Sequence, residues 1–319
     1  MAIPASRTLA FSEIPLIDIG PLVAKGADNA PEIVAAIRKA CMEVGFMQLI
    51  NHGVPRPALN RLYGEAQKFF NLPVEERMKV AMANSPYFRG YLPLKYEGDE
   101  YLGTNLQEAF NTFHERPIGA NPVHGPNQWP AAVPGLKDAM MSYFAECEKL
   151  AYKLLPAFAL ALGLKSNHFD AMFREPLIML KLNHYPLQEK PEHENEIGVV
   201  GHTDSGCFTI LWQDNNGGLE VQNKAGEWVG VPPIDGAYVI NLGRIMQILS
   251  NGMFSATEHR VINRTGADRY SIPMFVNPSY NTTIKPLVGD PPADFKPFLS
   301  GHYQEDVYRR TYPHKKLAA

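Results

Sequence analysis

Eight short apolar segments follow one another after Phe173, and they constrain the fold more than any other feature of this sequence. Turn-forming residues separate many of them, as at 214–218, where the sequence is Asp-Asn-Asn-Gly-Gly. Short, regularly spaced strands separated by turn-forming residues are typical of an antiparallel sandwich, jelly roll or barrel. The segments cover residues 177–185, 198–203, 207–212, 219–222, 227–231, 237–242, 259–263 and 270–276.

The first half of the chain is predicted to be mostly helical. Apolar residues recur at helical spacing over 31–44, and further helices are expected at 55–70, 74–83 and 136–162, the last with a kink at Pro156. Strands are expected at 14–18, 46–50 and 106–113, long irregular stretches at 84–105 and 114–134, and a last helix at 303–312. No flexible linker is evident. We therefore expect a mainly β fold with flanking α-helices, in which a region 1–120 packs on a core formed by 121–319.

Composition narrows the class of protein. The 319 residues carry a formal net charge of −3 and no basic cluster, which argues against a nucleic-acid partner. No apolar run is long enough to span a bilayer and no signal pattern precedes the first strand, so we expect a soluble, cytoplasmic protein. Cys41, Cys147 and Cys207 are widely spaced and are expected to be free thiols. The oligomeric state is not predictable from the sequence.

Three residues form a candidate metal site. His202 and Asp204 have the i, i+2 spacing that places two side chains on one side of a strand. His259 lies far enough along the chain for several strands to return it to the same end of a sandwich. Two histidines and one carboxylate are the ligands of a mononuclear non-haem Fe(II) site with open positions. A lone His-x-Asp pair also arises by chance, and the histidines without such a pattern are assigned to structure or surface: His52, His114, His124, His168, His193, His302 and His314.

Two further pairs predict an anion site near this metal. Arg269 and Ser271 share a strand face by the same spacing, and a guanidinium beside a hydroxyl can bind a carboxylate. Asn183 and Tyr185 also share a face, and both can donate hydrogen bonds to a carboxylate. A surface arginine beside a satisfied hydroxyl is the alternative for the first pair. His184, between Asn183 and Tyr185, should point to the opposite side.

With these residues in place, almost the whole chain resembles the isopenicillin N synthase-like group of Fe(II)/2-oxoglutarate-dependent oxygenases. The resemblance implies a double-stranded β-helix (jelly-roll) core. It further implies Fe(II) bound by His202, Asp204 and His259, with O2 and 2-oxoglutarate as co-substrates. The matching motifs are Ile-Asn-His-Gly-Val-Pro at 50–55, Phe-Arg-Gly-Tyr at 88–91, Asn-His-Tyr-Pro at 183–186, His-Thr-Asp at 202–204, Gly-Gly-Leu-Glu-Val at 217–221, Ser-Asn-Gly at 250–252, His-Arg-Val at 259–261 and Arg-Tyr-Ser at 269–271.

The resemblance also implies roles for the anion site and a reaction. Arg269 and Ser271 would bind the far carboxylate of 2-oxoglutarate, assisted by Asn183 and Tyr185. A small organic substrate would be hydroxylated, desaturated or cyclised while succinate and CO2 are released. Arg244 follows Gly243 where relatives usually carry aspartate, a departure that could alter a local turn or the rim of the pocket.

Several alternatives stay open at this point. Isopenicillin N synthase and the oxidase of aminocyclopropane carboxylate keep an Arg-x-Ser pair without using 2-oxoglutarate. A non-catalytic binding protein on the same scaffold is a further alternative. Phe275 is a candidate substrate contact or a core residue. Arg89 and Tyr91 are candidates in a loop that could cover the pocket, where Arg89 could hold a substrate carboxylate or form a structural salt bridge. The organic substrate itself cannot be chosen from the sequence.

Overall fold

The computed structural model describes residues 12–94, 105–119, 121–187, 198–263 and 266–312. Two β-sheets form its centre, and the larger has eight strands in the order β1-β2-β10-β7-β12-β5-β4-β3. Neighbouring strands are antiparallel except for β1 and β2. The bounds are β1 Leu16–Asp18, β2 Phe46–Ile50, β3 Gly90–Leu92, β4 Glu108–Phe113, β5 Pro176–Tyr185, β7 Phe208–Gln213, β10 Tyr238–Leu242 and β12 Arg269–Ser279.

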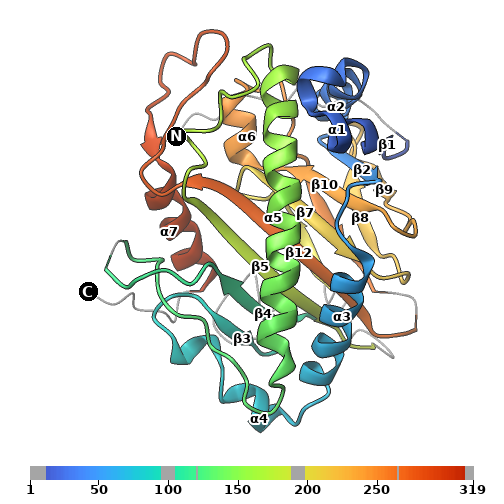
Figure 1. The fold of residues 1–319 in the computed structure, drawn as a ribbon, viewed down its shortest axis with the longest axis vertical. Helices are drawn as coiled ribbons and strands as arrows, with labels where there is room; N and C mark the ends of the chain where they lie inside the picture. Colours follow the sequence, from blue (N-terminus) through green and yellow to red (C-terminus); the bar gives the residue numbers. More distant parts are fainter. Residues whose placement is uncertain (1–11, 95–104, 120, 188–197, 264–265, 313–319) are drawn as a thin grey trace.

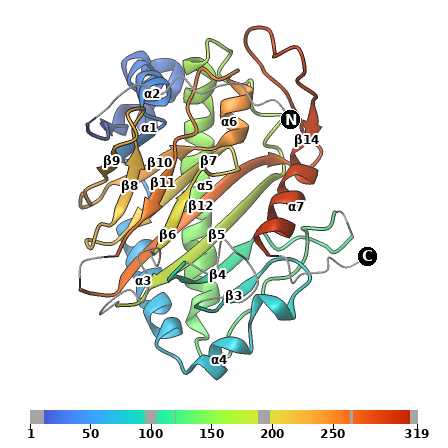
Figure 2. The ribbon, with the colours of Figure 1, turned by 180° about the vertical axis from the view of Figure 1, so that it is seen from behind.

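A smaller sheet faces the large one and completes the jelly roll. Its order is β6-β11-β8-β9, with β6 Val199–His202, β8 Leu219–Gln222, β9 Trp228–Gly230 and β11 His259–Val261. Figure 2 shows β6, β8 and β11 in front of the large sheet. The predicted fold class, a mainly β jelly roll with flanking helices, is confirmed. A separate hairpin pairs β13 Thr283–Ile284 with β14 Phe298–Leu299.

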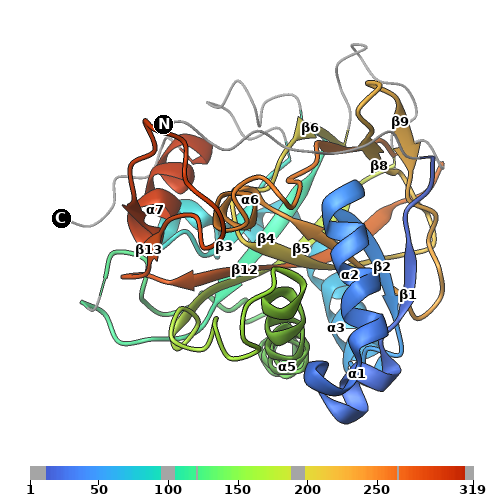
Figure 3. The same ribbon diagram turned by 90° about the horizontal axis from the view of Figure 1, so that it is seen from above.

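Helices cover the other face of the large sheet, so that the molecule has three layers when seen from above (Figure 3). The long helix α5, Gly135–Ala161, runs across this face and continues past Pro156 as one helix (Figure 1). The remaining helices are α1 Gly20–Lys25, α2 Pro31–Glu43, α3 Arg56–Phe70, α4 Val74–Met78, α6 Arg244–Leu249 and α7 Ser300–Thr311.

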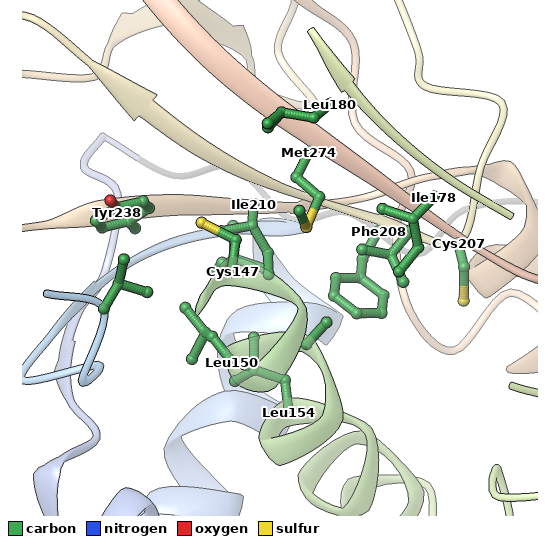
Figure 4. Packing of buried hydrophobic residues seen from close by; sticks show 14 of the residues in the cluster. Cys147, Leu150, Leu154, Ile178, Leu180, Cys207, Phe208, Ile210, Tyr238 and Met274 are labelled. Atoms are coloured by element: carbon green, nitrogen blue, oxygen red, sulfur yellow. The ribbon is translucent and has the colours of Figure 1, made fainter. Parts of the chain in front are cut away.

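The main core lies between α5 and the large sheet. Leu150 and Leu154 of α5 point toward Phe208 and Ile210 of β7 and toward Met274 of β12 (Figure 4). All five side chains are at most 1% exposed. Because alternate residues of a strand point to opposite faces, this packing leaves the odd-numbered residues of β5 and β12 to face the small sheet.

Several local predictions need correction. The stretch 84–105, expected to be a loop, contains β3, although its residues 95–104 lie outside the described part. The helix expected over 74–83 ends at Met78, and a short 3-10 turn follows at Met82–Asn84. Helices α1 and α6 were not predicted, because six residues are too few for a clear periodic pattern.

Strands from both halves of the chain share the large sheet. β2, β3 and β4 come from the predicted N-terminal region. β2 pairs with β10 and β4 pairs with β5, both of the predicted core region, and β3 pairs with β4. The boundary near residue 120 stays a prediction. The three cysteines are free and buried, as expected. Among the described residues, no helix has both the length and the apolar character needed to cross a membrane.

Candidate active site and metal centre

The three predicted metal ligands meet at one end of the small sheet. His202 is the last residue of β6 and His259 the first of β11, and the two residues are direct partners across these antiparallel strands. The carboxylate atom Oδ1 of Asp204 lies 3.8 Å from Nε2 of each histidine. One ligand atom from each residue lies within 4.8 Å of the others. This cluster can therefore hold one metal ion.

Strand alternation alone does not account for the position of Asp204. β6 ends at His202, so Asp204 lies in the turn that leads to β7. Two side chains of the large sheet hold its carboxylate instead: Oδ2 accepts hydrogen bonds from Thr209 Oγ1 at 2.5 Å and from Asn241 Nδ2 at 2.6 Å. These bonds leave Oδ1 available to the metal. Hydrogen bonds of this kind, from residues that do not bind the metal themselves, orient metal ligands in proteins.

Backbone carbonyl groups orient both histidine rings. His202 Nδ1 lies 2.9 Å from the carbonyl oxygen of Val200, and His259 Nδ1 lies 3.2 Å from that of Thr257. An Nδ1–H that donates to a carbonyl oxygen fixes the tautomer in which Nε2 carries the lone pair. Both Nε2 atoms are therefore prepared to bind a metal.

The electrostatics of the cluster also favour a divalent cation. Burial lowers the pKa of His259 to about 4, and the neighbouring His202 acts in the same direction, so the His259 imidazole stays neutral. Burial alone would raise the pKa of Asp204, but the two histidines and the hydrogen bonds from Thr209 and Asn241 outweigh it and lower the pKa. Neutral imidazoles and an ionised carboxylate are the forms that bind Fe(II).

The predicted anion site is assembled on the paired strands β5 and β12. Arg269 is the direct partner of Tyr185, and Ser271 is the direct partner of Asn183. The guanidinium lies over the Tyr185 ring at 4.8 Å from its centroid, and Asn183 Nδ2 donates to Ser271 Oγ at 3.2 Å. The structure thus brings all four predicted residues together on the face that looks toward the small sheet.

Two of the three guanidinium nitrogen atoms of Arg269 donate hydrogen bonds within the described residues, and the third does not. Its Nε donates to the carbonyl oxygen of Gly217 at 2.5 Å, and Nη2 donates to Gln213 Oε1 at 3.1 Å. Nη1 is buried and has no hydrogen-bond partner among the described residues. The side chain is only 1% exposed, so water does not readily compensate for the missing partner. A buried guanidinium group of this kind fits an anionic ligand.

The Gly217-Gly218 turn makes this arrangement possible. Both glycines have positive φ angles, 71° and 88°, which other residues rarely adopt. A Cβ atom at Gly218 would lie 2.5 Å from the carbonyl oxygen of Ile262. The turn therefore depends on glycine and brings a backbone carbonyl group to Arg269.

Lys181, which the sequence analysis missed, belongs to the same wall of the site. This wall is the face of β5 and β12 that looks toward the small sheet. Lys181 lies two residues before Asn183 on β5, and so on the same strand face. Burial lowers the pKa of Lys181 to about 8, although the charge of Asp204 acts in the opposite direction. A single charged residue in the otherwise apolar stretch Leu177–Leu182 was the signal that could have drawn attention to it.

The three predicted substrate contacts lie in different places. Phe275 faces the small sheet and pairs with Thr209, whose hydroxyl group binds Asp204. Arg89 is buried, and its guanidinium donates to the carbonyl oxygens of Tyr87 and Val123, both at 2.9 Å.

Tyr91 lies on the helix-covered side of the sheet. There its ring contacts Phe69 of α3 and its hydroxyl group donates to Glu108. The structure therefore places Phe275, and not Tyr91, on the face toward the small sheet, next to the Thr209 that binds Asp204.

The structure also shows where His184 and Arg244 lie. His184 points away from the anion site, as predicted, and stacks on Tyr270 with ring centroids 4.6 Å apart. Arg244 begins α6, and its Nε donates to Thr203 Oγ1 at 2.7 Å. Its backbone N–H also donates to the carbonyl oxygen of Asp204 at 2.8 Å. Arg244 thus supports the turn that carries Asp204.

Comparison with known families agrees with this geometry. Residues 14–132 match the N-terminal model described as non-haem dioxygenase in morphine synthesis, and residues 178–278 match the 2OG-Fe(II) oxygenase superfamily. The chain belongs to the 2OG-Fe(II) oxygenase superfamily. It is an Fe(II)- and 2-oxoglutarate-dependent dioxygenase, and its metal triad is His202, Asp204 and His259.

Individual relatives extend the likeness over nearly the whole chain. A homoarginine-6-hydroxylase of Glycine max is 35% identical over 87% of this chain and 89% of its own. A 2-oxoglutarate-Fe(II) type oxidoreductase of Emericella nidulans is 32% identical over 95% of this chain and 93% of its own. The solved structure of a full-length Neurospora crassa protein in complex with alpha-KG and thymine superposes with a TM-score of 0.83, at 27% identity, over 94% of this chain and 97% of that one.

Proposed function

We propose that this dioxygenase hydroxylates a C–H bond of a small organic molecule, with Arg269, Ser271, Asn183 and Tyr185 binding 2-oxoglutarate. The observation that carries the proposal is the unpartnered Arg269 Nη1, which lies on the face of the large sheet that looks toward the small sheet and its metal triad. The overall reaction would convert substrate, 2-oxoglutarate and O2 into hydroxylated substrate, succinate and CO2. Desaturation and cyclisation are the other outcomes that this chemistry allows.

Each of the four residues of the anion site would have a different role in binding 2-oxoglutarate. The Arg269 guanidinium would form a charge-assisted pair with the far carboxylate of 2-oxoglutarate, and the Ser271 hydroxyl group would donate a second hydrogen bond. Burial raises the pKa of Tyr185 against the opposing effects of Arg269 and Ser271, so its hydroxyl group stays protonated and able to donate. Asn183 would hold Ser271 in position through its existing hydrogen bond.

The triad residues would provide geometry for the metal. His202, Asp204 and His259 would hold Fe(II) from one side, and the bound metal with its co-substrate supplies the oxidising chemistry. Thr209 and Asn241 keep the Asp204 carboxylate oriented. Phe275, next to Thr209 in the sheet, would form an apolar part of the substrate wall.

The direct test is stoichiometry. Purified protein with Fe(II) and 2-oxoglutarate should form succinate in step with O2 uptake, and turnover should increase when a substrate binds. A His202→Ala variant should lose bound iron and this activity, whereas His302→Ala, outside the triad, should keep both. Normal iron binding by His202→Ala would contradict the assignment.

The expected cytoplasmic location also stays a proposal, to be tested by fractionation of the cells that produce the protein.

A further inference from the structure

Lys181 occupies a central position on the wall that carries the anion site. Along β5 it lies between Met179 and Asn183 on one strand face, and Leu180 and Leu182 on either side of it point into the helix-covered core. Across the sheet its partner in β4 is Asn111. Met179 pairs with Phe275 of β12, so the apolar part of the wall begins next to Lys181.

The Lys181 ammonium group has no protein partner in the part of the chain that the structure describes. Its pKa responds to burial and to the charge of Asp204, and to no hydrogen bond. The ion pairs of Asp204 are with His202 and His259, so that carboxylate does not neutralise the lysine. A partly buried ammonium group is costly to leave unpaired, and proteins usually pair such charges.

The neighbouring residues divide the wall into two parts. On one side are Asn183 and Ser271, which belong to the proposed 2-oxoglutarate site. On the other side are Met179, Phe275 and Phe113, which belong to an apolar cluster. Lys181 lies at the junction of the two parts. A molecule seated against the apolar cluster would present one end to the Lys181 ammonium.

We propose that Lys181 binds a carboxylate of the organic substrate and so selects carboxylic acids over neutral analogues. The proposal rests on the function proposed above, because it assumes that Arg269 and Ser271 take the co-substrate. The Lys181 ammonium would donate charge-assisted hydrogen bonds to the substrate carboxylate. The apolar side chains of Met179 and Phe275 would contact the carbon skeleton that follows it.

The test measures binding to the anaerobic holoenzyme, with Fe(II) and saturating 2-oxoglutarate, by calorimetry. The probes are matched pairs of an acid and its primary carboxamide: L-homoarginine and 4-coumaric acid, each with its amide, and thymine as an uncharged compound. We expect at least one acid to bind, and its amide to bind about 10- to 100-fold more weakly, which is the range for a lost charge-assisted hydrogen bond.

Three variants separate charge from packing. Lys181→Met keeps most of the side-chain volume and should bind acid and amide equally weakly. Lys181→Arg should retain most of the preference for the acid. Lys149→Met, on the exposed surface of α5, should behave as the wild-type protein. Unchanged affinity for 2-oxoglutarate in Lys181→Met would show that this variant still folds and forms the co-substrate site.

Several outcomes would overturn the proposal. These are amides that bind as well as acids, acids that all fail to bind, or an acid preference that persists in Lys181→Met. A large loss of 2-oxoglutarate affinity in Lys181→Met would assign the lysine to the co-substrate instead. Failure of the wild-type protein to bind 2-oxoglutarate at all would contradict the proposed function, and is thereby distinguished from a failure of the lysine assignment.

Discussion

The two faces of the β5–β12 strand pair carry charged clusters of opposite character. On the face toward the small sheet, Arg269 Nη1 has no described partner and Lys181 has none either. On the helix-covered face, Glu108 accepts hydrogen bonds from Tyr91 and Arg77, and its Oε1 lies 2.7 Å from His184 Nδ1. The second ring nitrogen of His184 lies 3.2 Å from a carboxylate oxygen of Asp268.

The difference distinguishes a ligand site from a structural cluster. Arg77 and His184 both face the Glu108 carboxylate, although Arg77 Nε and His184 Nε2 have no hydrogen-bond partner among the described residues. This cluster therefore already contains its own carboxylate. The groups around Arg269 are equally well positioned but incomplete, and a bound carboxylate would complete them. Buried charges are usually paired in folded proteins, so a buried cation without a carboxylate partner indicates a binding site better than the presence of charge alone.

The largest effect is expected from removing a metal ligand. Asp204→Ala should lose bound Fe(II), and succinate formation should fall to background, because two histidines alone provide neither the charge nor the geometry of the site. The measurements are iron content and succinate yield. Asp235→Ala, at an exposed ion pair with Arg56, is the matched control and should keep both. Normal iron content in Asp204→Ala would contradict the assignment of Asp204 as a metal ligand.

Loss of the Arg269 guanidinium, whose Nη1 has no partner among the described residues, should weaken co-substrate binding. In Arg269→Ala the KM for 2-oxoglutarate should rise about 10- to 100-fold, the value of a charge-assisted hydrogen bond, while kcat at saturation changes less. Steady-state kinetics with varied 2-oxoglutarate provide the measurement. Arg56→Ala, which removes an exposed arginine, serves as control. An unchanged KM would mean that the incomplete cluster is not the co-substrate site.

Removing a residue that orients Asp204 should weaken metal binding less than removing Asp204 itself. Thr209→Val deletes the hydroxyl group that donates to Asp204 Oδ2 and keeps the branched shape. Metal affinity should fall about 10- to 100-fold, as is usual for groups that orient a ligand. Competition with a chelator measures this change. Thr282→Val, whose hydroxyl group donates to the carbonyl oxygen of Met172 away from the site, should leave the affinity unchanged.

The smallest effect on turnover is expected from a change in the cluster around Glu108, although the same change should have a large effect on stability. Glu108→Gln leaves the buried Arg77 without its counter-charge and should lower the free energy of unfolding by about 3 to 5 kcal/mol. The kcat/KM of the folded variant should remain close to that of the wild-type protein. Denaturant unfolding and kinetics below the unfolding transition provide both values. A selective loss of activity would show that the two faces are not independent.

This stability difference should depend on pH. Burial would raise the pKa of Glu108, but hydrogen bonds from His184 and Tyr91 and the charge of Arg77 lower it below the ordinary value of 4.5. The stabilisation by Glu108 is therefore present above pH 4.5 and is lost as the pH falls through the lower, folded-state pKa. The difference in unfolding free energy between wild type and Glu108→Gln should narrow over that range. A constant difference would contradict the sign of the shift.

The sequence was most informative where local pattern and spacing decide the structure. The apolar segment 46–50 predicted β2 with the bounds that the structure has, and the pair Arg269 and Ser271 predicted the shared strand face. Helix α6 could not be predicted, because it is fixed by distant backbone contacts such as that from the Ile245 N–H to the carbonyl oxygen of Gly206.

Lys181 and Tyr91 show the same limit for the site. An isolated lysine in a strand usually reaches solvent, and only the pairing of β5 with β4 and β12 encloses Lys181. Likewise, the face on which Tyr91 lies depends on how β3 pairs with β4, and the sequence gives no sign of that pairing. Both assignments needed contacts between segments that are far apart along the chain.

The central claim is that the metal triad binds Fe(II) while the incomplete cluster around Arg269 binds 2-oxoglutarate, and an anaerobic titration tests it most directly. Adding 2-oxoglutarate to the Fe(II) protein in the absence of O2 should produce a visible charge-transfer band, because the 2-oxo acid would chelate the iron. The band should saturate at one equivalent per chain and require a higher 2-oxoglutarate concentration in Arg269→Ala. Iron that binds to the triad without any such band on addition of 2-oxoglutarate would contradict the account.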